Sequence, residues 1–207
     1  MPKTQQELAQ LVEKDGASPG VVEAFRSVAR EDFVPDRGRR EAYLDRPVAI
    51  PEHQTTSQPS LIARMIDALE LSPEDRVLEV GTGYGFQTAL LSKLAGEVYS
   101  VERHEDLAEM ARSNLLRAGI DSVLVEVGDG WLGLTEHAPF DAIVVSAAAA
   151  GIPPALVDQL AETGRMVIPL AGPRDDEVVL FERRGGSLQR VRLITPARFV
   201  PLVPGPP

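Results

Sequence analysis

Three glycines at alternate positions are the part of this sequence that most clearly indicates chemistry. Gly81, Gly83 and Gly85 directly follow the mostly apolar run Val-Leu-Glu-Val at 77–80. Glycine adopts a positive φ without strain and leaves no side chain in the way of a ligand. We therefore expect a strand, a tight loop and a helix that begins at Phe86, with a ligand bound against the bare backbone of the loop.

The spacing of these glycines decides between nucleotide ligands. A dinucleotide site has the pattern G-x-G-x-x-G, in which the third glycine allows close packing of the helix. Phe86 stands where that glycine would be, and no Gly-Lys-Ser or Gly-Lys-Thr follows to make a P-loop. A ligand with an adenosine-like body and no diphosphate remains, and S-adenosylmethionine fits that description.

Two further loops carry groups that a nucleoside needs. The run 97–102 ends in Glu102, which is 102 − 83 = 19 residues after Gly83, and a carboxylate there can accept hydrogen bonds from both ribose hydroxyls. The run 123–127 leads into Gly128-Asp129-Gly130, where Asp129 is expected near the adenine. The alternative is a tight glycine turn without a ligand, but three such loops together favour a binding site.

The predicted cofactor-binding residues are Glu79, Gly81, Thr82, Gly83, Tyr84, Gly85, Glu102, Arg103, Gly128, Asp129 and Gly130. For Glu79 a second role is open, since a carboxylate at the end of a strand could simply accept hydrogen bonds from loop amides.

The elements that must position these loops alternate along the chain. Apolar runs predict strands at 77–80, 97–102, 123–127, 140–145 and 165–170. Amphipathic runs between them predict helices at 86–95, 105–118 and 153–161. This alternation predicts an α/β fold with a mostly parallel, doubly wound sheet, in which ligands bind outside the carboxyl ends of the strands. Runs at 177–183 and 189–193, joined by 184–187, predict an antiparallel C-terminal hairpin.

The N-terminal part of the chain is predicted to be helical. Apolar residues share one face in each of two segments: Leu8, Leu11 and Val12, then Val21, Val22, Phe25 and Val28. After a polar connection at 36–46 and an extended piece at 47–51, Ser57 is a candidate N-cap for a helix with Pro59 in its first turn.

The chain is predicted to form one domain. Its parts are an N-terminal helical and substrate-loop region at 1–70, a cofactor-binding core at 76–170 and C-terminal strands at 177–203. The tail at 204–207 is expected to fray.

Composition excludes several classes of function. The 207 residues carry a formal net charge of −10, which disfavours nucleic acid as a partner. They include no cysteine, so a disulfide framework, a thiolate nucleophile and a cysteine zinc site are excluded, and nothing indicates another metal site. No segment resembles a signal peptide or a membrane helix. We expect a cytoplasmic monomer that needs no metal and binds no membrane.

Five blocks, in the same order, resemble the protein-L-isoaspartate O-methyltransferase family. They are Ile-Pro-Glu-His-Gln-Thr-Thr-Ser-Gln-Pro at 50–59, Arg-Val-Leu-Glu-Val-Gly-Thr-Gly-Tyr-Gly at 76–85, Val-Gly-Asp-Gly at 127–130, Pro-Phe-Asp-Ala-Ile-Val-Val-Ser-Ala-Ala at 139–148 and Arg-Phe-Val-Pro-Leu-Val at 198–203. The resemblance covers about Phe33 to Val203. It implies a Rossmann-like S-adenosylmethionine-dependent methyltransferase fold and methylation of the free α-carboxylate of isoaspartyl residues in damaged proteins. The ester would close to a succinimide, whose hydrolysis returns some normal aspartate, so the implied role is repair.

The resemblance also implies a substrate side of the site. Ser57 matches the position at which the family orients the substrate carboxylate, with Thr55 and Thr56 beside it as further donors. Gln54, Ser57, Ala147 and Ala148 are the predicted substrate-binding residues. A carboxylate is already ionised at neutral pH, so the reaction needs no general base and the site acts by positioning.

His53 departs from the family pattern, because many members have glycine just before the Gln-Thr pair. A titratable side chain there could alter peptide preference or pH dependence.

Three other interpretations stay open. A related enzyme could methylate an ordinary aspartate of a ribosomally made peptide, but such relatives carry an added C-terminal region, and the chain stops soon after Val203. A carboxyl methyltransferase for small molecules would share the cofactor loops but not the block at 54–59. A non-catalytic protein that binds S-adenosylmethionine would have the same fold but would not transfer the methyl group.

Overall fold

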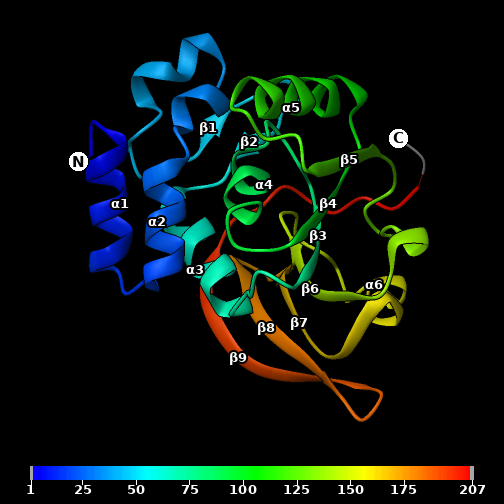
Figure 1. Cartoon of the computed structure of the whole chain (residues 1–207). Helices are drawn as coiled ribbons and strands as arrows, with labels where there is room; N and C mark the ends of the chain where they lie inside the picture. The colour runs from blue at the N-terminus through cyan, green and yellow to red at the C-terminus, as the bar shows by residue number, and fades with distance from the viewer. Residues whose placement is uncertain (1, 206–207) are drawn as a thin grey trace.

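The predicted alternation of strands and helices forms a seven-stranded sheet (Figure 1). The computed structural model describes residues 2–205. The strands of the sheet are β3 (Arg76–Val80), β4 (Glu97–Glu102), β5 (Val123–Val127), β6 (Phe140–Val145), β7 (Leu160–Leu170), β8 (Asp176–Arg184) and β9 (Ser187–Ala197). Their order is β5-β4-β3-β6-β7-β8-β9, parallel from β5 to β7 and antiparallel for the last two pairs. The predicted doubly wound sheet with an antiparallel C-terminal hairpin is confirmed.

The strand order reverses between β3 and β6, which are neighbours although two strands lie between them in the chain. Such a switch point leaves the loops after the two strands pointing apart, and ligands of open α/β sheets bind in the crevice between them. The glycine loop follows β3, and Ser146 follows β6. The topology therefore places the predicted site at this crevice.

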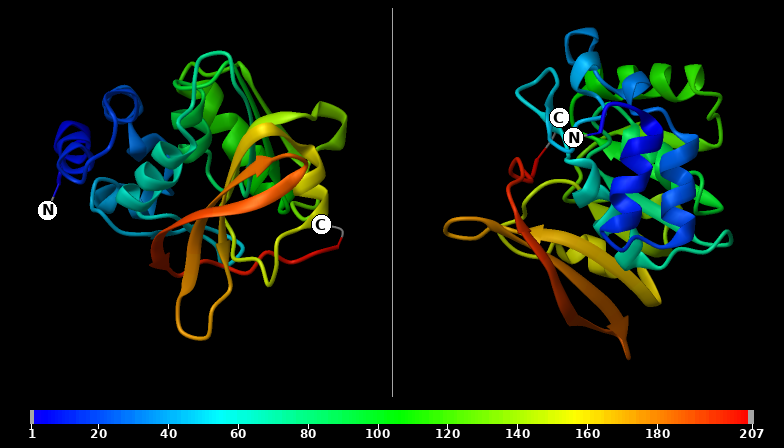
Figure 2. Two further views of the ribbon diagram at one scale, coloured as in Figure 1. Left: turned by 90° about the horizontal axis from the view of Figure 1, so that it is seen from below. Right: turned by 90° about the vertical axis from the view of Figure 1, so that its left-hand side faces the viewer.

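Successive strand residues pack on opposite faces of the sheet. In β3, Val77 belongs to one apolar core and Leu78 to another. The first core lies under helices α3 (Pro59–Leu69), α4 (Phe86–Leu91) and α5 (Glu105–Arg117), with α1 (Gln5–Lys14) and α2 (Pro19–Ser27) outside them. The second lies under α6 (Pro154–Gln159) and the loop before β6. Figure 2 shows the N-terminal helices α1 and α2 side by side on one side of the sheet.

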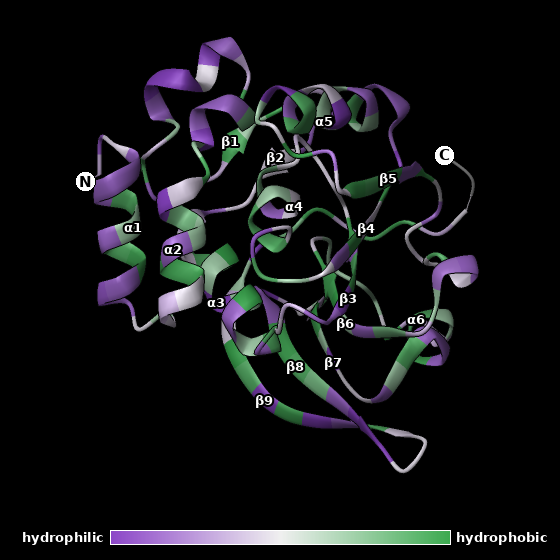
Figure 3. Cartoon of the chain, in the orientation of Figure 1, coloured by the Kyte–Doolittle hydropathy of each residue, from purple (hydrophilic) through white to green (hydrophobic). Residues whose placement is uncertain are grey.

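The helices carry the amphipathic pattern that the sequence indicated. Figure 3 shows hydrophobic bands alternating with hydrophilic ones along α1, α2 and α5. In α2, Val21, Val22 and Phe25 are buried, and Phe25 meets the ring of Phe86 edge-on at 5.7 Å. Each fully buried side chain of this size contributes about 1.5–3 kcal/mol, so this contact fixes the N-terminal helices to the start of α4.

Several predicted boundaries are wrong, most clearly at the ends of two helices and at the hairpin turn. The helix expected at 86–95 ends at Leu91, and its following residues form a turn. The helix expected at 153–161 ends at Gln159, because Leu160 becomes extended and pairs with Phe140 as the start of β7. The hairpin turn is shorter than expected, since two glycines with φ of 58° and 75° close it and let both strands run longer.

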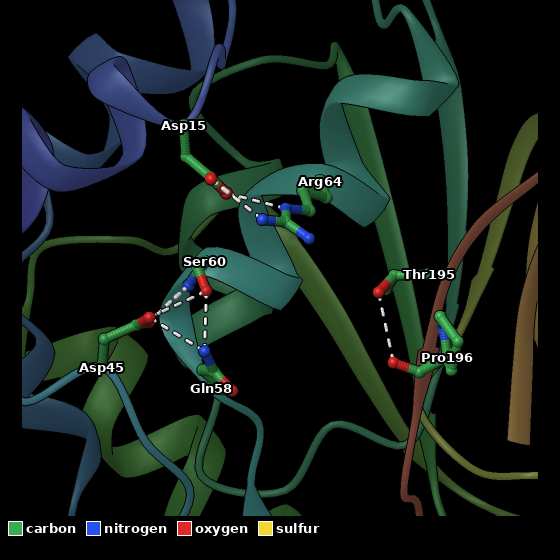
Figure 4. Close-up of polar contacts among 7 residues, drawn as sticks. All are labelled: Asp15, Asp45, Gln58, Ser60, Arg64, Thr195 and Pro196. Carbon is green, nitrogen blue, oxygen red and sulfur yellow. Dashed lines mark hydrogen bonds and ion pairs between the residues drawn. The ribbon is translucent and has the colours of Figure 1, made fainter. Parts of the chain in front are cut away.

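Asp45, and not Ser57, caps helix α3. The residue at the N-cap position is Gln58, which makes no side-chain cap bond. The Asp45 carboxylate instead accepts hydrogen bonds from the Ser60 backbone N–H at 2.9 Å, the Ser60 hydroxyl at 2.9 Å and the Gln58 amide at 2.8 Å (Figure 4). A carboxylate from a distant loop thus supplies the negative charge that a helix N-terminus favours, which leaves Ser57 outside the helix.

A short extended segment crosses the carboxyl edge of the sheet after β9. Ala148 N–H donates to the Val200 carbonyl at 2.8 Å, and Leu202 N–H donates to the Ala148 carbonyl at 2.7 Å. Gly205 N–H donates to Asp129 at 2.7 Å. The expected fraying at 204–207 is therefore wrong for Pro204 and Gly205, while 206 and 207 lie outside the described residues.

In the part of the chain from 2 to 205, no helix combines the length and apolar character that a membrane crossing requires.

Candidate functional site

The glycine loop has the backbone conformation that its sequence predicts. The φ angles are 92° at Gly81, 57° at Gly83 and 90° at Gly85, all in the region that disfavours side chains. Gly81 N–H donates to the Val101 carbonyl at 2.9 Å, which ties the loop to the end of β4. The loop is thereby held open against the crevice at the switch point.

Glu102 ends β4 with its carboxylate against this loop. One oxygen accepts the Gly83 N–H at 2.8 Å, and the other accepts the His104 N–H at 3.0 Å. The residue is 5% exposed, yet it lines the cavity beside the loop. Each carboxylate oxygen accepts more than one hydrogen bond, so both oxygens keep capacity for a ligand diol.

A cavity of about 300 Å³ lies over the carboxyl ends of β3, β4 and β6. The predicted cofactor residues that line it are Gly81, Thr82, Gly83, Tyr84, Glu102, Arg103 and Gly130. Of the predicted catalytic and substrate residues, Gln54, Thr55, Thr56, Ser57 and Ala147 line it too. The structure thus brings residues from five separate segments around one space.

The remaining predicted site residues lie behind the cavity wall: Glu79, Gly85, Gly128, Asp129 and Ala148 are absent from its lining. Asp129 accepts the N–H groups of Trp131 at 2.9 Å and Gly205 at 2.7 Å, so its carboxylate anchors the loop and the C-terminal segment. Ala148 is buried beneath that same segment.

Glu79 is fully buried beneath the cavity floor. One carboxylate oxygen accepts the Gln87 amide at 3.0 Å, and the other accepts the hydroxyls of Thr88 at 2.5 Å and Ser100 at 2.7 Å. These partners are side chains rather than the loop amides considered from the sequence. Burial raises the pKa of Glu79 to about 7, against the lowering effect of these three hydrogen bonds.

A second cavity, also of about 300 Å³, adjoins the first. Four residues line both: Thr55, Ser57, Ser146 and Val200. Beyond this junction the second cavity runs between α3 and the end of β9, past Thr195 and Arg64, whose guanidinium is held by Asp15 at 2.7 Å (Figure 4). A ligand in the second cavity therefore reaches a ligand in the first at Ser57 and Ser146.

Arg30 is a buried residue that lies behind the site, and the sequence did not indicate it. Its side chain is completely buried, and it donates to the carbonyls of Ala42 at 2.9 Å, Leu44 at 3.0 Å and Arg46 at 3.1 Å. The same guanidinium donates to the Thr56 hydroxyl at 3.0 Å and the Ser57 carbonyl at 3.0 Å. Burial lowers the pKa of Arg30 to about 10, despite the nearby charge of Asp45.

The C-terminal segment was also missed as part of the site. Val200, Pro201, Leu202 and Val203 line the first cavity, and Arg103 donates to the Val203 carbonyl at 2.9 Å. The block at 198–203 was a signal of family resemblance only, because neither its composition nor its spacing indicates that it forms a wall.

His53 lies at an exposed turn, outside both cavities. Its φ of 56° and that of Glu52, 58°, are in the left-handed region. This conformation explains why glycine suits the position in the family pattern, since glycine adopts it without strain.

Within residues 2–205, the only three-residue group spaced to hold a metal ion is Glu126, Glu136 and His137, which lines neither of the two cavities. His137 already bonds Glu126 at 2.9 Å and stacks on Tyr99.

Comparison with known proteins shows which proteins this chain is similar to. A family model described as protein-L-isoaspartate(D-aspartate) O-methyltransferase matches residues 3–206. A protein-L-isoaspartate O-methyltransferase of Koribacter versatilis is 48% identical over 183 residues, which cover 88% of this chain and 82% of that protein. One of Methylorubrum extorquens is 46% identical over 196 residues, covering 95% of this chain and 86% of that protein.

Solved structures agree with these relatives. A protein-L-isoaspartate O-methyltransferase structure superposes with a TM-score of 0.87 at 30% identity, covering 95% of this chain and 65% of that one. A Plasmodium falciparum structure, described as a protein-L-isoaspartate O-methyltransferase in complex with S-adenosyl-L-homocysteine, gives a TM-score of 0.82 at 25% identity. The match covers 98% of this chain and 99% of that one.

Proposed function

This chain belongs to the protein-L-isoaspartate(D-aspartate) O-methyltransferase family, and we propose that its two joined cavities hold the two reactants. It is an S-adenosylmethionine-dependent protein carboxyl methyltransferase that acts on isoaspartyl residues. The first cavity takes the cofactor, and the second takes the isoaspartyl peptide. Their junction is where methyl donor and carboxylate meet.

The residues of the first cavity fit the cofactor. A Cβ at Gly83 would come within 3.5 Å of Ile50, so the bare backbone keeps the space for a ligand open. Glu102 offers two carboxylate oxygens to a ribose diol, and Ile50, Val101 and Leu107 add apolar walls for a nucleoside base. The structural match to the protein described as an S-adenosyl-L-homocysteine complex, which covers 98% of this chain at 25% identity, supports the same assignment.

The residues at the junction fit a carboxylate acceptor. Ser57 and Thr55 present hydroxyl groups there, and Ser57 lies just before helix α3 rather than in it. A hydroxyl donor to a carboxylate makes a charge-assisted hydrogen bond, which is stronger than a neutral one. We assign Ser57 as the residue that orients the substrate carboxylate, with Thr55 as its neighbour and Gln54 on the peptide side.

Thr56 has a different role from the one that the family pattern implied. Its hydroxyl is bound by Arg30 at 3.0 Å and by Val48 N–H at 3.3 Å, and the residue is buried. We propose that Thr56 positions Ser57 and does not contact the substrate carboxylate itself.

The site would accelerate the reaction by aligning the methyl donor with the acceptor carboxylate. When bound, the cofactor supplies a methyl group on a sulfonium, which is a good leaving group. Ser57 fixes the acceptor carboxylate, which is ionised at neutral pH, so no residue has to remove a proton. The C-terminal segment and the loop at 50–57 line the first cavity, and a bound peptide that excludes water there would strengthen the electrostatic contacts inside. Holding two reactants in line in this way can account for a large part of a rate enhancement.

The observation that carries this proposal is the sharing of Ser57 by both cavities. The test incubates the protein with labelled S-adenosylmethionine and two peptides that differ only in one isoaspartyl or aspartyl linkage, then counts base-labile methyl ester. Label on the isoaspartyl peptide alone is the expected result. Label on the aspartyl peptide would indicate a peptide-modifying enzyme. No label on either peptide would exclude both the isoaspartyl and the aspartyl residue as acceptors.

We further propose that the enzyme works as a cytoplasmic monomer and needs no metal or nucleic acid. The net charge of −10 opposes binding to phosphate, and the lack of cysteine suits a reducing compartment. Methyl transfer from a sulfonium to a carboxylate requires no Lewis acid, so activity should be unchanged by a chelator. Light scattering should give the mass of one chain, and cell fractionation should recover the protein in the cytoplasmic fraction.

A further inference from the structure

Ser146 stands at the junction of the two cavities together with Ser57, and no substrate role follows for it from the sequence. It is the first residue after β6, and its N–H donates to the Val80 carbonyl of β3 at 2.8 Å. A Cβ on Gly81 would lie 3.3 Å from the Ser146 Cβ. The side chain is thus held at the crevice between the two strands of the switch point, directly beside the glycine loop.

The Ser146 hydroxyl accepts a hydrogen bond from the Gln87 side chain. The Gln87 amide nitrogen lies 3.0 Å from the Ser146 oxygen and 3.0 Å from one Glu79 oxygen. Both hydrogen bonds are donated by the Gln87 NH₂ group, which is the group that an ionised Glu79 carboxylate requires at this place. One hydrogen of that group is donated to Glu79 and the other to Ser146. The second Glu79 oxygen accepts from Thr88 and Ser100, which fixes the carboxylate in place.

This arrangement restricts the direction of the Ser146 proton. A hydroxyl has one hydrogen and two lone pairs, and one lone pair of Ser146 is taken by Gln87. The hydroxyl hydrogen cannot point back toward an NH₂ group, so it points away from Gln87. Gln87 lies at the floor, and the other side of Ser146 faces the junction of the two cavities.

We propose that the Ser146 hydroxyl donates a hydrogen bond to the isoaspartyl α-carboxylate and that Gln87 and Glu79 are positioning residues that turn it toward that carboxylate. This proposal rests on the assignment of the junction as the acceptor site. Ser57 reaches the carboxylate from the loop before α3, and Ser146 reaches it from the sheet. The four residues shared by both cavities carry no charge, so the hydrogen-bond donors at the junction itself are neutral, and the two arginines of the second cavity, Arg64 and Arg198, lie beyond it.

The first experiment compares Ser146→Ala with Ser146→Thr, which keeps the hydroxyl. Loss of a hydrogen bond to a charged group should raise the KM for an isoaspartyl peptide about tenfold or more, while Ser146→Thr stays within about threefold of the parent. Affinity for S-adenosylmethionine, measured by calorimetry, should change by less than about twofold. Ser92→Ala is the matched control, because that hydroxyl is bound to the Ala89 carbonyl on α4 and lines neither cavity.

The second experiment tests the positioning role. Gln87→Met keeps the length of the side chain but cannot donate, so it should raise the peptide KM about threefold in the parent chain. It should have no further effect on KM in the Ser146→Ala background, because the hydroxyl that Gln87 orients is already gone. A merely structural role for Gln87 would give the same change in both backgrounds.

The outcomes separate this proposal from the assigned reaction. If the parent chain methylates no peptide, the acceptor assignment itself fails. If the parent chain is active and Ser146→Ala leaves the peptide KM unchanged, the role of Ser146 is excluded while the reaction stands. The same holds if Ser146→Ala weakens binding of S-adenosylmethionine as much as it raises the peptide KM.

Discussion

The guanidinium of Arg30 donates a 3.0 Å hydrogen bond to the hydroxyl of Thr56, 26 positions further along the chain. Arg30 has no exposed surface, and its other hydrogen bonds go to backbone carbonyls between residues 42 and 57. A buried cation is unfavourable unless its hydrogen bonds are satisfied. The loop that carries Ser57 therefore surrounds the Arg30 guanidinium, and the conformation of the loop depends on the hydrogen bonds to it.

Replacing Arg30 by Lys should disturb this loop, because one ammonium with three donors cannot satisfy five acceptors spread around a planar fork. We expect the free energy of unfolding to fall by about 2–4 kcal/mol and kcat/KM for an isoaspartyl peptide to fall at least about tenfold. Urea unfolding and steady-state kinetics measure the two effects. Arg39→Lys, at an exposed position nearby, is the control. A folded Arg30→Lys enzyme with unchanged kcat/KM would show that Arg30 serves stability alone.

Replacing Ser57 by Ala should lower methyl transfer and leave cofactor binding nearly unchanged. The hydroxyl lies at the junction, and a lost hydrogen bond to a carboxylate is worth about 1.5–3 kcal/mol, or about 10- to 100-fold in kcat/KM. The Ser57 carbonyl that Arg30 holds is retained in the variant. Kinetics with an isoaspartyl peptide and calorimetry with S-adenosylmethionine measure the two effects. A large loss of cofactor affinity would contradict the division of the site into two cavities.

Replacing Glu102 by Ala should have the opposite effect and chiefly weaken binding of S-adenosylmethionine. The variant loses the two oxygens assigned to the ribose, together with their bonds to Gly83 and His104. We expect the Kd for S-adenosylmethionine to rise about 30-fold or more by calorimetry. Glu102→Gln, which keeps the shape and one acceptor, should give a smaller rise, and Glu105→Ala, an exposed carboxylate outside the cavity, should give none. Normal binding by the Glu102→Ala protein would remove the ribose assignment.

Glu79 should make stability depend on pH. Its pKa is raised by burial to about 7, so the folded state holds the proton more tightly than the unfolded state, in which the ordinary value is 4.5. Stability from this group is fully present below about 4.5 and is lost as pH rises to about 7, by roughly 3 kcal/mol in total. The Glu79→Gln variant lacks this change.

The measurement compares urea unfolding at pH 5 and pH 8 for the parent chain, Glu79→Gln and the exposed control Glu74→Gln. Relative to Glu79→Gln, the parent chain should lose stability between the two pH values, and Glu74→Gln should follow the parent. Equal pH dependence in the parent and Glu79→Gln would mean that Glu79 keeps one protonation state throughout.

The sheet was predictable because its strands are continuous apolar runs at regular spacing. Strands β4, β5 and β6 have the bounds that their residues indicate, and the glycine loop has the positive φ angles that its spacing requires. The family pattern added Ser57, which the alternation of strands and helices does not single out.

What could not be predicted depends on contacts between distant residues. Nothing near Arg30 in the sequence shows that it will be buried, because its partners lie from 12 to 27 positions away. The cap on α3 was assigned to the adjacent Ser57, whereas Asp45 takes that role from 15 positions before Ser60. Ser146 likewise acquires its partner, Gln87, only when β3 and β6 become neighbours.

The segment that crosses the carboxyl edge also has a meaning for synthesis of the protein. A ribosome delivers every strand of the sheet before it delivers Val200 to Val203, which line the cofactor cavity. A nascent chain that ends after β9 lacks this wall. Since we propose that the first cavity takes the methyl donor, we expect affinity for S-adenosylmethionine to be gained only when this segment is added, late in translation.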